Sequence, residues 1–168
     1  KEEDGIRRYV HVGTGNYNAA TSRFYTDFGL MSADPDLGAD LNDFFNELTG
    51  GAGPPQKQFR RLLVAPHSLV QGVERMIERE IDHAKAGRPA RIQVKVNGLA
   101  DRKVVKLLYK AAEAGVQVDL IVRSICTLRP GVDGLSSGVQ VLSILGRFLE
   151  HSRTYYFENA GQSEYYIG

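Results

Sequence analysis

The chain has 168 residues, of which 42% are hydrophobic and 24% are charged, as is ordinary for a soluble globular protein. Its formal net charge of +1 gives no overall attraction to nucleic acid or to a membrane surface, so an anion site must come from local arginines and no nucleic-acid partner is expected. No run is long and apolar enough to cross a bilayer. The single cysteine, Cys126, excludes an internal disulfide and suits a reducing compartment such as the cytoplasm.

The first fifty residues contain two predicted strands and one predicted helix. Apolar residues alternate over residues 6–12, and a second strand is predicted over residues 24–31. Asp34 and Pro35 are typical of a helix start, and the apolar residues over 36–48 fall on one stripe of a helix. Since this region is too short for a complete domain, we expect it to pack on sequence outside the chain.

A glycine-rich turn follows the first predicted strand. His11 is followed by Gly13, Thr14, Gly15 and Asn16, and two glycines around a threonine allow a tight turn with exposed N–H groups. Such a turn can hold a phosphate group, or it can simply connect two strands. The sequence leaves both interpretations open. In the same way, His11 can be a functional residue or can support the turn.

Residues 51–58 form the clearest predicted linker, because they are rich in glycine and proline. We therefore divide the chain into residues 1–50, this linker, and a second domain over residues 59–168. Strands alternate with helices after the linker, which predicts an α/β fold with right-handed crossovers and parallel neighbours. Ser68 and Asp101 are the predicted helix caps. The predicted strands cover residues 60–65, 91–96, 116–122, 139–144, 154–157 and 164–167.

Basic side chains near strand ends are the main candidate site residues. Arg123 directly follows the strand over 116–122, at the end where ligands bind in such sheets, so it is either an anion ligand or a polar strand terminator. If the strand that ends at Phe157 begins at His151, its imidazole and Arg153 face the same side. A cation beside a titratable nitrogen suits a phosphoryl group, but a lone histidine can equally be structural.

Three other kinds of site find no support in the sequence. The spacing of histidine and cysteine fits no zinc motif, so we predict no metal ligand. The chain lacks the G-x-x-x-x-G-K-[ST] pattern, so a nucleotide is not held by a P-loop. Cys126 has no nearby base in the sequence and is interpreted as a core residue rather than a nucleophile.

Several long motifs resemble the long bacterial polyphosphate kinases, in order and over nearly the whole chain. They are H-V-G-T-G-N-Y-N, T-S-R-F-Y-T-D-F-G-L-M-S-A-D, L-V-A-P-H-S-L, V-K-V-N-G-L, V-R-S-I-C-T-L-R-P-G and I-L-G-R-F-L-E-H-S-R. The resemblance implies a C-terminal fragment. Residues 1–50 would be the tail of one phospholipase D-like domain, and residues 59–168 a second one, incomplete at its C-terminus. The implied fold is a mixed, largely parallel sheet flanked by helices.

The resemblance also implies a reaction and its residues. The family reversibly transfers the terminal phosphate of ATP to polyphosphate through a phosphohistidine. That histidine and the Mg²⁺-associated arginines lie upstream of this sequence, so we expect the isolated chain to be inactive. Tyr25, Arg123 and His151 match positions at the family's ATP site, with His151 in a catalytic role. Arg153 stands where phospholipase D relatives carry lysine, and Gly13 to Asn16 resembles the turn that follows their histidine motif.

The implied partners are ATP or ADP, inorganic polyphosphate and the remainder of a polyphosphate kinase chain. The complete protein is expected to be a cytoplasmic homo-oligomer, with membrane association left open. Two other functions also stay open. One is a non-catalytic module that binds polyphosphate or a nucleotide through the arginines at positions 123, 129, 147 and 153. The other is a phospholipase D-like phosphodiesterase, which the absence of a histidine-x-lysine pair argues against.

Overall fold

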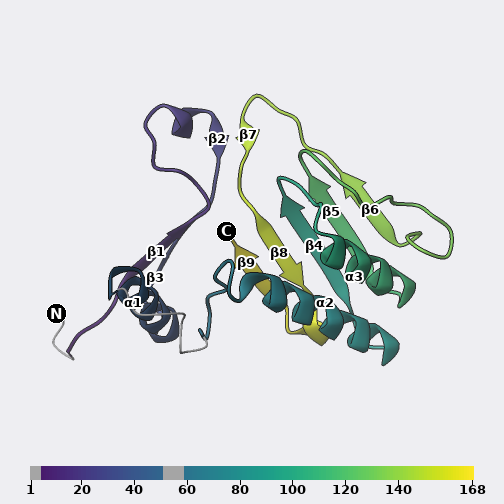
Figure 1. Ribbon diagram of the computed structural model, residues 1–168, viewed down its shortest axis with the longest axis horizontal. Helices are drawn as coiled ribbons and strands as arrows, with labels where there is room; N and C mark the ends of the chain where they lie inside the picture. Colours follow the sequence, from purple (N-terminus) through teal and green to yellow (C-terminus); the bar gives the residue numbers. More distant parts are fainter. Residues whose placement is uncertain (1–4, 51–58) are drawn as a thin grey trace. The chain divides into compact units, whose positions relative to one another are not determined.

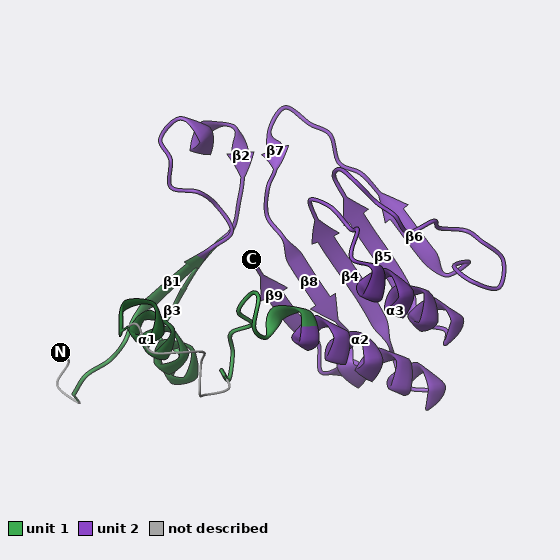
Figure 2. Ribbon diagram, viewed as in Figure 1, with its two compact units in different colours: residues 1–12, 29–70 green, residues 13–28, 71–168 purple. Residues whose placement is uncertain are grey.

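The computed structural model describes residues 5–50 and 59–168 (Figure 1). The chain forms two compact units, one of residues 1–12 and 29–70 and the other of residues 13–28 and 71–168 (Figure 2). We call them unit 1 and unit 2. The predicted linker lies outside the described residues. Residues 13–28 therefore belong to the same unit as the C-terminal part of the chain, although they precede that linker.

In unit 1, β1 (Val10–Gly13) pairs with β3 (Gly29–Ser32), and α1 (Pro35–Gly50) follows. The helix begins as predicted, because the Asp34 side chain accepts a hydrogen bond from the Leu37 N–H at 2.8 Å. The first strand is shorter than predicted and begins four residues later.

The strand predicted over residues 60–65 is wrong. The N–H groups of Arg60, Arg61 and Leu62 all donate to the Asp40 carboxylate, at 2.7, 2.6 and 3.2 Å. Asp40 is completely buried, so these donors satisfy a carboxylate that would otherwise be costly to bury. Backbone groups committed to a side chain cannot also join a strand ladder, and the segment is therefore irregular.

Unit 2 is built on a five-stranded sheet in the order β6-β5-β4-β8-β9 (Figure 1). Neighbouring strands β6, β5 and β4 are parallel, whereas β8 is antiparallel to both β4 and β9. All strands except β8 therefore run in one direction, which confirms the prediction of a mixed, largely parallel sheet. The strands are β4 (Arg91–Val96), β5 (Gln117–Val122), β6 (Val139–Leu142), β8 (Thr154–Phe157) and β9 (Glu164–Ile167).

Two helices, α2 (Leu69–Lys85) and α3 (Arg102–Glu113), cover one face of this sheet (Figure 1). The predicted cap of α3 is confirmed, because the Asp101 side chain accepts from the N–H groups of Lys103 and Val104 at 2.8 and 3.0 Å. Alternate strand residues point into the core beneath the helices. The fully buried apolar side chains of this core include Ile77, Ile92, Leu108, Val118, Leu120 and Phe157.

An ion pair joins α2 to β9 at the edge of the sheet. The Arg79 guanidinium donates to both carboxylate oxygens of Glu164, at 3.1 and 2.7 Å. Hydrogen bonding from Arg79 lowers the pKa of Glu164 below its ordinary value, against the opposing effect of desolvation. The two side chains are 31% and 32% exposed, so solvent weakens the pair.

We expect Glu164→Gln to lower the free energy of unfolding by about 1 kcal/mol at neutral pH, after allowance for this exposure. Because the folded-state pKa of Glu164 is lowered, its stabilisation is fully present above the ordinary carboxyl value of 4.5. It is lost as the pH falls through the lower folded-state pKa. Urea unfolding of the two proteins should therefore show a difference that shrinks in acid. A difference of the same size at every pH would contradict this assignment.

Candidate functional site

A short parallel pairing of distant segments positions the candidate site. After η1 (Thr21–Arg23), strand β2 (Tyr25–Thr26) runs beside β7 (Leu149–Glu150), as Figure 1 shows. The predicted strand over residues 24–31 is thus split between β2 and β3. Past the end of β7, the Thr26 carbonyl accepts hydrogen bonds from the N–H groups of residues 151 and 152, at 3.2 and 3.3 Å. This backbone pairing brings His151 to the segment that carries Tyr25.

His151 contacts two side chains of this segment. Its ring stacks on Tyr25, with the ring centroids 4.9 Å apart and the planes inclined by 18°. Its Nδ1 lies 2.9 Å from Oδ1 of Asp27. The His151 and Asp27 side chains are 16% and 24% exposed, so the pair is shielded but still reaches solvent. An ionised carboxylate only accepts hydrogen bonds, so Nδ1 donates to Asp27 and Nε2 is the nitrogen that can act on a ligand.

The glycine-rich turn holds Asp27 in place. The Thr14 hydroxyl donates to Oδ1 of Asp27 at 2.9 Å and accepts from the Phe28 N–H at 2.9 Å. Thr14 is only 6% exposed. A Cβ added at Gly15 would lie 2.6 Å from Oδ2 of Asp27, so a side chain at Gly15 would displace the carboxylate. The turn from Gly13 to Asn16 therefore supports the partner of His151.

Arg123 lies directly after β5, as predicted, and reaches the segment before His151. Its guanidinium donates to the Glu150 carbonyl at 3.1 Å, and its own N–H donates to the Val96 carbonyl at 3.2 Å. A guanidinium has five N–H donors, more than this one side-chain bond uses. The arginine and the imidazole are thus joined through a single intervening residue, Glu150.

Arg153 does not share a strand with His151, because β8 begins at Thr154. His151 and Arg153 were expected to face the same side only if His151 began this strand, and it does not. The reason is that the peptide N–H of His151 donates to β2 rather than to a neighbour in the large sheet. The Arg153 Nε instead donates to Oδ1 of Asn97 at 3.2 Å, beyond the carboxyl end of β4.

His11, another predicted candidate, lies in unit 1. Its ring is close to Gly29 of β3, since a Cβ added there would lie 3.0 Å from Cε1 of His11. A glycine at this position therefore allows the imidazole to pack against the neighbouring strand.

The sequence reasoning missed Asp27, although a signal for it was present. Tyr25 and Asp27 are two residues apart in an extended segment, so their side chains point to the same side. Tyr25 was a candidate, and its spacing to the next carboxylate could have identified Asp27 as well.

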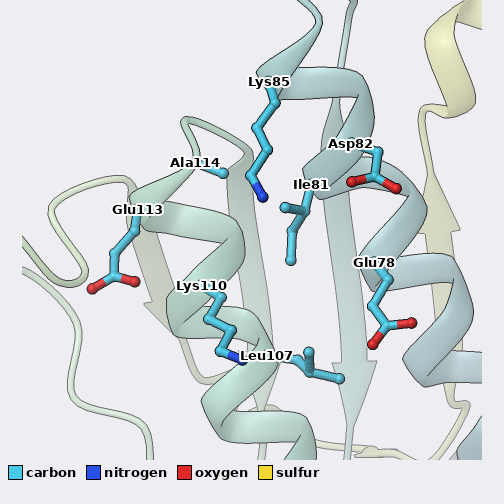
Figure 3. A pocket seen from close by; sticks show the side chains of 8 residues that line it. All are labelled: Glu78, Ile81, Asp82, Lys85, Leu107, Lys110, Glu113 and Ala114. Carbon is cyan, nitrogen blue, oxygen red and sulfur yellow. The ribbon is translucent and has the colours of Figure 1, made fainter.

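A groove of about 610 Å³ between α2 and α3 is a less suitable site (Figure 3). Lys85 and Lys110 line it together with Glu78, Asp82 and Glu113, so its walls carry charges of both signs. Carboxylates would repel a bound polyanion. The groove lies where α3 ends and leads into β5, at the opposite end of that strand from Arg123. We therefore assign it no part in the candidate site.

Within residues 5–50 and 59–168, no three histidine, cysteine, aspartate or glutamate side chains gather into a group that could hold a metal ion. The helices described for this chain include none with the length and apolarity that a membrane span requires.

Two family models match the chain. Residues 62–168 match the model of polyphosphate kinase C-terminal domain 2, and residues 1–54 match that of polyphosphate kinase C-terminal domain 1. Tyr25 and Asp27 lie in one matched region and His151 in the other. The candidate site therefore draws on both regions.

Curated relatives and a solved structure give the same result. The chain is 54% identical to the polyphosphate kinases of Parasynechococcus marenigrum and Thermosynechococcus vestitus, and 52% identical to that of Streptomyces coelicolor. Each match covers 100% of this chain but only 22 or 23% of the relative. The crystal structure of polyphosphate kinase from Porphyromonas gingivalis matches with a TM-score of 0.86 and 39% identity, over 96% of this chain and 26% of that one. The chain thus spans about a quarter of the length of these relatives.

Proposed function

This chain belongs to the polyphosphate kinase family and has its phospholipase D-like α/β fold, and we propose that it supplies nucleotide- and phosphate-site residues to a kinase. The complete protein would reversibly transfer the terminal phosphate of ATP to inorganic polyphosphate. The observation that supports this most is the cluster in which His151 stacks on Tyr25, pairs with Asp27 and lies one residue from the Arg123 contact.

Each residue of this cluster has a role in the proposal. Phosphoryl transfer depends mainly on charge neutralisation and positioning, so Arg123 would bind phosphate oxygens. The His151 Nε2 would donate a proton to the oxygen of ADP as its bond to the terminal phosphorus breaks. Asp27 would stabilise the protonated imidazole through Nδ1, and Tyr25 would fix the ring plane and contact the nucleotide. Arg153 would add positive charge near the phosphates.

The group that receives the phosphate would lie elsewhere in the protein. By resemblance, the phosphorylated histidine belongs to a segment upstream of these residues. We further propose that residues 1–50 are the tail of a first phospholipase D-like domain and residues 59–168 a second. A cytoplasmic homo-oligomer is proposed for the complete protein. Cys126, a free thiol, favours a reducing compartment. Mg²⁺ would accompany the ATP, and no ligand for it is assigned here.

The test uses ATP labelled in its terminal phosphate. We expect the complete protein to make labelled polyphosphate and to carry an acid-labile phosphate on a histidine outside residues 1–168. This chain alone should do neither, because the proposed nucleophile is not among its residues. Polyphosphate made by the chain alone, or a phosphate on His151, would overturn the proposed division of roles.

The second candidate is a non-catalytic module that binds polyphosphate or a nucleotide. The contact of Arg123 beside His151 is compatible with simple anion binding. Binding needs the guanidinium but no proton donor, so substitution of the imidazole separates the two functions. Turnover and affinity should be measured on the same variants for this reason.

A further inference from the structure

The largely buried ammonium group of Lys95 binds the residues on both sides of His151. Lys95 lies in β4, and its side chain is only 15% exposed. Its Nζ lies 2.8 Å from Oε2 of Glu150 and 2.7 Å from Oγ of Ser152. Glu150 and Ser152 are the residues immediately before and after His151. One side chain therefore ties the imidazole-bearing segment to the sheet from both flanks.

The position of Lys95 in the fold makes it a rigid support for these two bonds. Lys95 pairs with Ile121 of β5 on one side and with Thr154 of β8 on the other, so its backbone is held in the middle of the sheet. Residues 151–153, by contrast, belong to no strand. A segment that lies outside any strand is held in position by its hydrogen bonds to other parts of the protein. Residues of a rigid strand are the best partners for such bonds.

Glu150 connects the two cations near His151, Lys95 and Arg123. The Glu150 side chain accepts from Lys95, and the Glu150 carbonyl accepts from Arg123. Ser152 is only 3% exposed, and its hydroxyl accepts a hydrogen bond from the Lys95 ammonium. Removing the ammonium would leave a shielded carboxylate without its cation and would release both flanks of the imidazole.

We propose that Lys95 is a positioning residue for the phosphoryl transfer assigned to His151, an inference that rests on the proposed function. Through its bonds to Glu150 and Ser152, Lys95 fixes the position of the His151 imidazole relative to Asp27 and Arg123. It does not touch the substrate. Its effect is on the geometry of proton donation, and small displacements of a reacting group reduce the rate strongly.

The chain offers a matched control on the same strand. Arg91 lies four residues before Lys95 in β4, so the two side chains leave the same face of the sheet. Arg91 also forms an ion pair, with its guanidinium 2.6 Å from Asp119, but it contacts neither flank of His151. Lys95→Met and Arg91→Met both remove a cation from this face, and only the first releases the imidazole segment.

The experiment measures polyphosphate synthesis by the complete kinase. We expect Lys95→Met to lower kcat about ten-fold with little change in the KM for ATP, and Lys95→Arg to recover most of the loss. Arg91→Met should leave kcat near the wild-type value. Equal kcat losses for Lys95→Met and Arg91→Met, or no loss in either, would overturn the inference.

Two further variants keep the result unambiguous. If Lys95→Met does not fold, Ser152→Ala is the deciding variant. It removes one of the two bonds from Lys95 and should lower kcat by a smaller factor. An unchanged kcat in Ser152→Ala would overturn the inference. His151→Ala separates the two proposals. If His151→Ala is impaired and Lys95→Met is not, only the positioning role fails. If His151→Ala keeps full turnover, the proposed function fails together with the inference that rests on it.

Discussion

On the proposed mechanism, His151→Ala in the complete protein should lower turnover by about 100-fold or more, the loss typical of a missing general acid. The substitution removes the Nε2 donor and the 2.9 Å contact between the imidazole Nδ1 and Asp27. The rate of ATP-dependent polyphosphate synthesis is the measurement. His67→Ala is the control, because it also removes an imidazole and His67 is exposed. It should keep its turnover.

Affinity measured on the same variants distinguishes a kinase site from a binding module. In a pure binder, His151→Ala would keep most of its affinity for ATP and polyphosphate, because Arg123 remains. In the kinase, the loss should fall mainly on kcat. Turnover close to that of the wild type would exclude His151 as the proton donor.

Asp27→Asn shows whether the carboxylate acts through the imidazole. We expect this change to reduce turnover about ten-fold in the wild-type background, since the amide no longer fixes the ring as a carboxylate does. In the His151→Ala background it should have little further effect, because residues that act as one unit are not additive. Additive losses would mean that Asp27 acts on something other than His151.

Phe157→Ala should lower the free energy of unfolding by about 3–5 kcal/mol, the largest stability effect that we expect from a single truncation. Phe157 is 0% exposed and pairs with Ile92 of β4 in the centre of the sheet. Its ring also meets Tyr166 edge to face, with centroids 6.3 Å apart. Truncation would remove these contacts and leave a cavity.

Urea unfolding of the 168-residue chain measures this loss. Tyr165→Ala is the control, because Tyr165 lies on the adjacent strand but is 76% exposed, and surface truncations usually cost less than about 1 kcal/mol. A similar small loss for Phe157→Ala would mean that the core beneath α2 does not depend on β8.

Local patterns in the sequence were sufficient for much of unit 2. The strand over 91–96 alternates apolar and polar residues, and the Asp101 cap satisfies N–H groups only two and three residues away. Each of these features depends on neighbours within a few positions. The sequence therefore predicted them with nearly correct boundaries.

Features that depend on distant residues were not predictable in this way. The segment over residues 60–65, which ends in an apolar run from Leu62, resembles a strand locally. Its first N–H groups instead donate to Asp40, twenty or more positions earlier. The partner of His151 is Asp27, at a separation of 124 positions. Lys95 binds Glu150 and Ser152 across separations of 55 and 57 positions. No local period encodes such contacts, so the site was predicted only in part.

The cluster around His151 takes its aromatic and acidic members from the region before residue 54 and its imidazole from the region after residue 62. Cleavage of the polypeptide between these regions would leave every one of these side chains intact but on separate fragments. Neither fragment would hold the assembled cluster by itself. Recovery of activity after such a cut would then require complementation, with the two pieces re-forming the β2–β7 pair.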